Sequence, residues 1–219
     1  MKEEAGVLFS IAADNRPIPG CTVSKEIYSS EDGYITHFSM AADTDISAEI
    51  YRYHKLLIVA GGELTVYAPG MNKEWKLQPR DLIITPTGTP VGMRTGTDTV
   101  YTEISMGRTL TMNNAIHTGE AFRLADLVPY QDGKIVNMDV AHNDKMKFVI
   151  MAFDAGTGLA EHAAPGEALI FALDGEGVIG YEGKAHTIKA GENFSFAKGG
   201  AHCVKAEKRF KMALLLTLE

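Results

Sequence analysis

Short apolar runs bounded by turn residues recur along the whole chain. The clearest is Ala168 to Leu173, which lies between Pro165-Gly166 and Asp174-Gly175 and is too short for a typical helix. It therefore reads as a buried strand. The same pattern predicts further strands at residues 21–27, 34–40, 48–60, 63–67, 81–86, 100–106, 134–140, 147–154, 177–181, 187–189, 193–196, 202–205 and 210–218.

The turns between these runs are rich in glycine, and Glu182-Gly183 has the form of a tight hairpin turn. Residues 119–127 are the one stretch that suggests a short helix or cap. Many short strands joined by glycine-rich turns favour an all-β sandwich or barrel.

An internal repeat divides the chain into two similar halves. Gly62, which follows one apolar run, recurs as Gly175 at the spacing that relates the other repeated positions. We therefore expect a tandem duplication, with one domain at 1–107, a polar connector at 108–118 and a second domain at 119–219. The other residues that keep this spacing are Gly6, Phe9, Ala12, Gly20 and Val23, which recur as Gly119, Phe122, Ala125, Gly133 and Val136.

Alternation along the strands predicts which side chains face the interior of the second domain. If Ala168 points inward, so do Ile170 and Ala172, because successive residues of a strand face opposite sides. Phe194, Phe196 and Met212 are further candidates for the same wall. Two interpretations stay open: the small alanines leave room for a compact ligand, or they relieve crowding in a packed core.

Two histidines carry a resemblance to a known family. Residues 156–175 resemble the first motif of the cupins, G-x5-H-x-H-x3,4-E-x6-G, and residues 191–202 resemble the second, G-x5-P-x4-H-x3-N. His162 and His202 fall on two of the four metal-ligand positions, whereas Ala164 and Ala168 fall on the others. Together with the repeat, the resemblance implies two tandem cupin-type jelly-roll β-barrels, a bicupin.

The resemblance also implies a metal site in the second domain, bound by His162 and His202. Imidazole suits Zn, Fe, Ni and Mn, but a typical site has at least three protein ligands. Glu167 stands one residue before the family's glutamate, and a bulge at Pro165-Gly166 would be needed to turn it inward. Glu161 is another carboxylate within reach. The alternative is a hydrogen-bonded histidine pair that binds no metal.

The matching positions of the first domain are Glu49, Tyr51, Lys55 and Val91. We expect no metal there, because a lysine repels a cation. The carboxylate and the lysine could pair with each other or hold an acidic ligand, or this domain could simply support its partner.

Composition removes several classes of function. A net charge of −7 without a basic run argues against a nucleic-acid surface. No apolar stretch approaches the length of a membrane span, and no hydrophobic signal region follows Met1. Cys21 and Cys203 are too few for a disulfide framework, and Cys203 should point away from His202. A cytoplasmic protein is the expectation.

Three hypotheses of function follow. The first is a bicupin that binds a small molecule around His162 and His202. The second is a metal-dependent cupin enzyme, an isomerase, dioxygenase or decarboxylase, using the same histidines with an irregular carboxylate. The third is a structural, dimeric module without a site, and a homodimer is compatible with all three. His37, His117, His142 and His186 have no partner at a useful spacing, and His186 is expected to be exposed. His54 faces the side opposite to Lys55 and is expected to be a surface or interface histidine.

Overall fold

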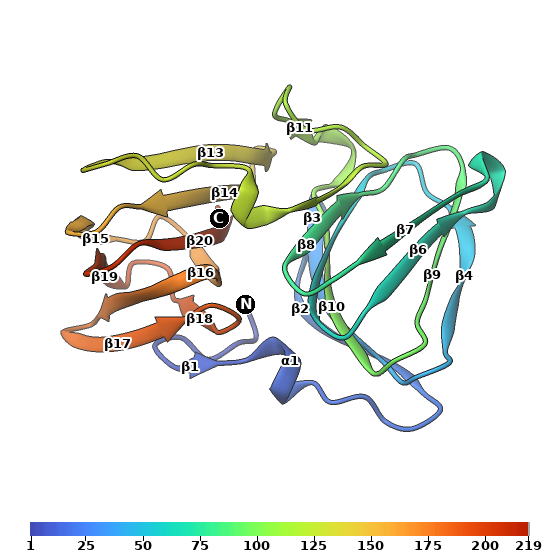
Figure 1. The fold of residues 1–219 in the computed structure, drawn as a ribbon, viewed down its shortest axis with the longest axis horizontal. Helices are drawn as coiled ribbons and strands as arrows, with labels where there is room; N and C mark the ends of the chain where they lie inside the picture. The colour runs from blue at the N-terminus through green and yellow to red at the C-terminus, as the bar shows by residue number, and fades with distance from the viewer. Residues whose placement is uncertain (219) are drawn as a thin grey trace. The chain divides into compact units, whose positions relative to one another are not determined.

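The computed structural model describes residues 1–218, and the chain forms two compact units. The N-terminal unit contains residues 11–110 and 114–123. The C-terminal unit contains residues 1–10, 111–113 and the chain from 124 onward. Regular structure in both units is almost all β-strand, which confirms the all-β class (Figure 1).

In the C-terminal unit, one sheet has the strand order β1-β18-β16-β20-β14-β13-β11, and β15, β17 and β19 extend it around β16. Among residues 1–218, the strand pairings of this unit are antiparallel. The elements are β1 (Leu8–Phe9), β11 (Thr111–Met112), η3 (Leu124–Asp126), β13 (Ile135–His142), β14 (Met146–Phe153), β15 (Thr157–Ala163), β16 (Glu167–Tyr181), β17 (Lys184–Lys189), β18 (Asn193–Phe196), β19 (Ala201–Ala206) and β20 (Phe210–Thr217).

The N-terminal unit has a six-stranded sheet, ordered β12-β8-β5-β10-β3-β2, and a four-stranded sheet, ordered β4-β9-β6-β7. Its elements are α1 (Ile11–Asp14), β2 (Thr22–Ser30), β3 (Gly33–Met40), β4 (Asp45–Ile50), β5 (Lys55–Gly61), β6 (Leu64–Ala68), η1 (Pro69–Met71), β7 (Lys73–Leu77), β8 (Asp81–Ile84), β9 (Pro90–Arg94), β10 (Thr99–Ser105), η2 (Gly107–Thr109) and β12 (Ala121–Arg123).

Three predicted strands differ from the structure. Residues 168–173 and 177–181 belong to the single strand β16, because Asp174-Gly175 is accommodated by a register shift instead of a chain reversal. Residues 48–60 are divided between β4 and β5. The polar approach to His162 is itself a strand, β15, although its residues are largely exposed and carry little apolar periodicity.

The domain ends also differ from the predicted 1–107 and 119–219. The first strand, β1, pairs with β18 of the C-terminal unit, and β12 pairs with β8 of the N-terminal unit. Residues 119–127 contain β12 and the short 3-10 helix η3, not a single helix. Backbone pairing of these short strands decides which unit they join, and local sequence carries no signal for it.

Equivalent strand pairs occur in both units. Glu49 lies opposite Val91 between β4 and β9, and His162 lies opposite His202 between β15 and β19. The register shifts in β4 and β15 fall directly before Glu49 and His162, at corresponding positions. The internal repeat seen in the sequence therefore coincides with repeated strand register.

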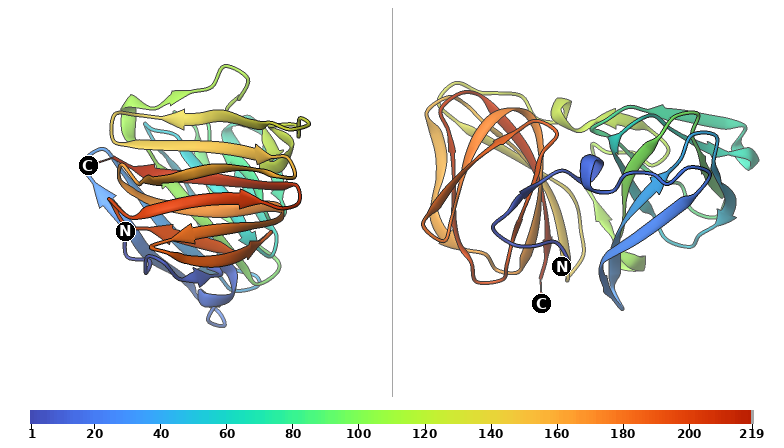
Figure 2. Two further views of the ribbon diagram at one scale, coloured as in Figure 1. Left: turned by 90° about the vertical axis from the view of Figure 1, so that its left-hand side faces the viewer. Right: turned by 90° about the horizontal axis from the view of Figure 1, so that it is seen from below.

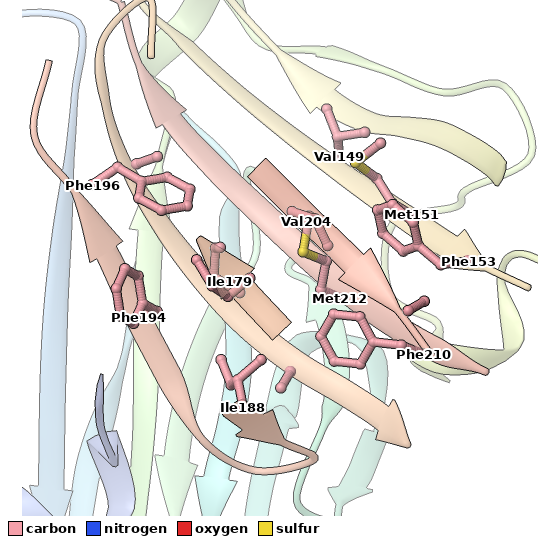
Figure 3. Packing of buried hydrophobic residues seen from close by; sticks show 14 of the residues in the cluster. Val149, Met151, Phe153, Ile179, Ile188, Phe194, Phe196, Val204, Phe210 and Met212 are labelled. Atoms are coloured by element: carbon pink, nitrogen blue, oxygen red, sulfur yellow. The ribbon is translucent and has the colours of Figure 1, made fainter. Parts of the chain in front are cut away.

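Each unit encloses its own apolar core. In the C-terminal unit, Phe194, Phe210, Met212 and their neighbours project from β14, β16, β18 and β20 into one cluster (Figure 3). The strands of this unit curve around that cluster (Figure 2). The N-terminal core contains Leu57, Val66 and Tyr101 among others. Within residues 1–218, no helix is long and apolar enough to span a membrane.

Candidate functional site

His162 and His202 lie side by side on β15 and β19. They are direct cross-strand partners, and their ring centroids are 4.1 Å apart with an interplanar angle of 53°. The register shift between Leu159 and His162 inserts one extra residue into β15 just before the pair. Such a bulge changes which face the following side chains occupy, and here it sets His162 beside His202.

Backbone carbonyls fix the proton positions on both rings. Nδ1 of His162 lies 2.9 Å from the carbonyl oxygen of Ala160, and Nδ1 of His202 lies 3.1 Å from that of Gly200. A carbonyl oxygen only accepts, so each Nδ1 must carry the hydrogen. In the neutral rings both Nε2 atoms are then acceptors, able to take a ligand's O–H or to donate to a metal ion.

The two histidines differ in exposure. His202 is only 6 % exposed, whereas His162 is exposed. Phe196 stacks on His202 with centroids 4.1 Å apart at 29°. One ring of the pair is thus held by packing, and the other remains accessible from solvent.

Burial lowers the pKa of His202 below its ordinary value of about 6.5. The neighbouring His162 lowers this pKa further, and the hydrogen bond to the carbonyl of Gly200 raises it in part. A depressed histidine pKa means that the unfolded chain binds the proton first. The contribution of His202 to the free energy of unfolding should therefore decrease as the pH falls from about 6.5 to the folded-state pKa. Below the folded-state pKa this contribution should stay constant.

We expect a His202→Gln variant to lack this loss of stability below about pH 6.5. Urea unfolding followed by circular dichroism across this pH range measures it. His117→Gln, at an exposed site, serves as the control and should keep the wild-type pH profile. If the free energy of unfolding of His202→Gln depends on pH as that of the wild type does, then His202 has the same pKa in the folded and unfolded states.

Sequence reasoning missed two rings that contact Phe196 and Phe194. Tyr181 lies opposite His202 in the strand register and stacks on Phe196, with centroids 5.4 Å apart. His186 is half-buried, not exposed as expected, and lies 4.9 Å from the ring of Phe194. Counting alternation outward from the Glu182-Gly183 turn would have placed His186 on the same face as buried Ile188.

The remaining predicted ligand-binding residues, Ala168, Ile170 and Met212, lie in the closed core. Their exposed fractions are 1 %, 0 % and 2 %. Side chains that a water-sized probe cannot reach do not border an open cavity, so the alanines fill a packed interior. A hollow of about 420 Å³ lies along β15 and β19 and is lined by residues 156–160 and 204–207, which include neither histidine.

Glu167 does not join the histidines. Its carboxylate pairs with the amino group of Met1 and is only partly exposed. Among residues 1–218, no group of three or more His, Cys, Asp or Glu side chains is arranged to hold a metal ion. The two imidazoles alone fall short of the three protein ligands of a typical centre, so a metal ion held here would need further donors such as water.

At the matching positions of the N-terminal unit, Tyr51 donates to Glu49 at 2.6 Å, and Lys55 is buried beside a carboxylate that the sequence reasoning did not consider, Glu103. Val91 lies in the apolar core. The predicted four positions therefore hold no cluster of ligating side chains.

Comparisons with known proteins agree with this architecture. Residues 149–218 match the family model described as Cupin domain. The chain is similar to the structure of a Cupin 2 conserved barrel domain protein from Leptotrichia buccalis, with 28% identity, a TM-score of 0.86, and coverage of 99% of this chain and 98% of that one. A search of curated proteins finds no match.

Two more distant structures share the fold. Salicylate 1,2-dioxygenase from Pseudoaminobacter salicylatoxidans, solved as adducts with gentisate, has 12% identity and a TM-score of 0.62, covering 89% of this chain and 73% of that one. AerE from Microcystis aeruginosa has 14% identity and a TM-score of 0.54, covering 94% and 100%. At these identities the two likenesses show a shared fold alone, and the match to the family model is confined to residues 149–218.

Proposed function

We propose that this protein is a bicupin whose C-terminal unit binds a small organic molecule at the His162–His202 pair. The observation that carries the proposal is the contact of two imidazoles whose Nδ1 hydrogens are both committed to backbone carbonyls. The repeated register of the two units supports the bicupin assignment. The free cysteines, Cys21 and Cys203, accord with a reducing compartment such as the cytoplasm.

The chemistry of the pair selects a ligand that carries a hydroxyl group. Neutral Nε2 atoms accept hydrogen bonds, so an O–H donor matches them, whereas a carboxylate alone offers only further acceptors. The exposed ring of His162 also offers a face to a flat molecule. A phenolic compound meets both conditions. Gentisate, named with the dioxygenase, is a suitable probe, and benzoate is the matched compound without a hydroxyl.

We expect gentisate to bind the wild-type chain and benzoate to bind at least about tenfold more weakly, because each hydrogen bond lost costs about 0.5–1.5 kcal/mol. Replacing both His162 and His202 by alanine should weaken gentisate binding by a similar factor or more. Isothermal titration calorimetry measures both. A His117→Ala/His142→Ala variant, which alters two histidines outside the pair, is the control.

Equal binding of gentisate and benzoate, or unchanged gentisate binding in the double variant, would contradict the proposal. If no small acid, sugar or phenol raises the melting temperature, the results favour the hypothesis of a structural module without a site. Light scattering then decides whether that module is a homodimer.

A metal-dependent enzyme remains the second candidate, because two neutral Nε2 atoms are good donors to a transition ion. Elemental analysis of protein purified without chelator distinguishes the metal-dependent enzyme from the metal-free binding protein. Stoichiometric Zn, Fe, Ni or Mn that disappears in the double histidine variant would favour the enzyme, and metal-free protein that still binds gentisate favours the proposal.

A further inference from the structure

Three ring side chains stand in a row across three neighbouring strands of the C-terminal unit. His162 on β15 lies opposite His202 on β19, and His202 lies opposite Tyr181 on β16. Residues directly opposite each other in antiparallel strands project from the same face of a sheet. The half-buried Tyr181 therefore shares the face that carries the histidine pair.

The ring of Phe196, on β18, connects Tyr181 to His202. It stacks on Tyr181 with centroids 5.4 Å apart at 24°, and on His202 with centroids 4.1 Å apart at 29°. Close-packed rings have few alternative orientations, because a tilt of one ring displaces its neighbour. The orientation of His202 therefore depends on Phe196, and through Phe196 it depends on Tyr181.

The hydroxyl of Tyr181 also holds the turn that leads into β19. It accepts a hydrogen bond from the backbone N–H of Ala197 at 3.3 Å. The N–H of Gly200 donates to the carbonyl oxygen of Ala197 at 3.1 Å and closes this turn. The carbonyl oxygen of Gly200 then accepts the Nδ1 hydrogen of His202. Tyr181 is thus connected through two backbone residues to the carbonyl that fixes the proton on His202.

Two glycines let the backbone approach the ring of Tyr181 closely on different edges. A Cβ added at Gly200 would lie 2.6 Å from Cε2 of the ring, and one added at Gly6 would lie 2.9 Å from Cδ1 and Cε1. Any residue other than glycine would displace the ring at either position. Tyr181 is therefore held between Gly6 and Gly200.

Gly6 belongs to the first residues of the chain, which lie along β18 (Figure 1). Leu8 pairs with Phe194 in the strand register, and the N–H of Gly6 donates to the carbonyl oxygen of Ser195 at 2.9 Å. Phe196, which stacks on His202, is the next residue of β18. Residues 6–9 therefore hold both the strand that carries Phe196 and one edge of the Tyr181 ring.

We propose that Tyr181, held between Gly6 and Gly200, is a positioning residue of the histidine pair. It keeps the carbonyl of Gly200 and the ring of Phe196 against His202, so that His202 offers Nε2 as an acceptor to a ligand's hydroxyl group. This inference rests on the proposed binding function of the pair. It makes the preference for a hydroxyl-bearing ligand depend on a tyrosine that acts through His202, and on residues 6–9 that act through the tyrosine.

The first test compares Tyr181→Leu, which removes the ring and the hydroxyl, with Tyr181→Phe, which keeps the ring between the two glycines. Long-range ¹H–¹⁵N NMR of the full-length protein at about pH 8 shows which nitrogen of His202 carries the hydrogen. We expect Tyr181→Leu to contain a population of His202 protonated on Nε2 and to bind gentisate about threefold to tenfold more weakly. Tyr181→Phe should lie between wild type and Tyr181→Leu in both measurements.

Gly6→Ala tests the contribution of the first residues. The added methyl group would displace the Tyr181 ring, so the His202 resonances and the gentisate affinity should change in the same direction as in Tyr181→Leu. Gly133→Ala is the matched control, because Gly133 has a φ of 67° and an added Cβ there would meet nothing within 4 Å. Phe210→Leu, which shortens a buried ring elsewhere in the same core, is the control for lost stability alone. Both controls should leave the His202 resonances unchanged.

The inference is overturned if His202 stays protonated on Nδ1 with unshifted resonances in Tyr181→Leu, even where the melting temperature or the gentisate affinity falls. An equal change in Phe210→Leu would overturn it as well, because the change would then report lost stability. If Tyr181→Leu does not fold, Gly6→Ala decides in its place. The proton position is measured without a ligand. If the wild type does not bind gentisate but Tyr181→Leu moves the proton of His202, the proposed function fails and the positioning role stands.

Discussion

Replacing Glu103 by alanine should lower the free energy of unfolding of the N-terminal unit by about 3–5 kcal/mol. The change leaves the ammonium group of Lys55 buried without its counter-ion, and breaking a buried pair from one side has a cost of this size. Tyr34 loses its acceptor at the same time. The other ion pairs between side chains in residues 1–218 are partly or largely exposed, so removing one of their charges should lower the free energy of unfolding by less.

The single tryptophan of the chain, Trp75, reports on this unit, because it packs against the N-terminal core. Urea unfolding followed by Trp75 fluorescence should show the loss. A Lys55→Met/Glu103→Leu variant is the matched control: it removes both charges and should regain most of the stability. If Glu103→Ala lowers the free energy of unfolding by less than about 1 kcal/mol, Lys55 and Glu103 do not form an ion pair in a water-poor interior.

Replacing Gly175 by alanine should destabilise the C-terminal unit by about 2–5 kcal/mol. Gly175 has a φ of 71°, where an L-residue is strained by about 1–2 kcal/mol. An added Cβ would also overlap the carbonyl oxygen of Arg209, which overpacks the site by about another 1–3 kcal/mol. The matching Gly62 has a φ of 78° and meets the carbonyl of Asp98 in the same way.

Gly183 provides the control for backbone strain alone. Its φ is 76°, but an added Cβ there would meet nothing within 4 Å. Gly183→Ala should therefore cost only the strain, about 1–2 kcal/mol. Thermal unfolding by calorimetry compares the two variants. Equal losses at Gly175 and Gly183 would show that the carbonyl of Arg209 moves freely to accept the methyl group.

The same glycines explain why much of the fold could be predicted from the sequence. Gly62 and Gly175 make matching close approaches in the two units, and their spacing is the sequence signal on which the proposed duplication rests. Apolar alternation placed Ala168, Ile170 and Met212 on the inner face of their strands, and they lie in one core cluster. Alternation gives only the facing direction, and could not tell a packed interior from an open pocket.

The rest depended on pairings between distant segments. The strand containing His162 is polar, so its pairing with β19 gives it order that its own sequence does not signal. The destinations of β1 and β12 likewise depend on long-range backbone bonds. The pairings of β1 and β12 cannot be read from the sequence, so the predicted boundaries at 1–107 and 119–219 were set by the repeat alone.

Glu103 was missed for a different reason. The family motifs direct attention to Glu49, Tyr51, Lys55 and Val91, and Glu103 lies outside them on the strand that closes the unit. A signal was present, since a single carboxylate stands within the apolar run from Val100 to Met106. An acid in a strand that reads as buried is a reason to search for its partner.

Long-range ¹H–¹⁵N NMR of the imidazole rings at about pH 8, where unperturbed histidine is neutral, decides whether the His162–His202 pair is a ligand site of two acceptor nitrogens. We expect both rings to be protonated on Nδ1, and we expect gentisate but not benzoate to shift both Nε2 resonances. Rings protonated on Nε2, or Nε2 resonances that ignore gentisate, would contradict it.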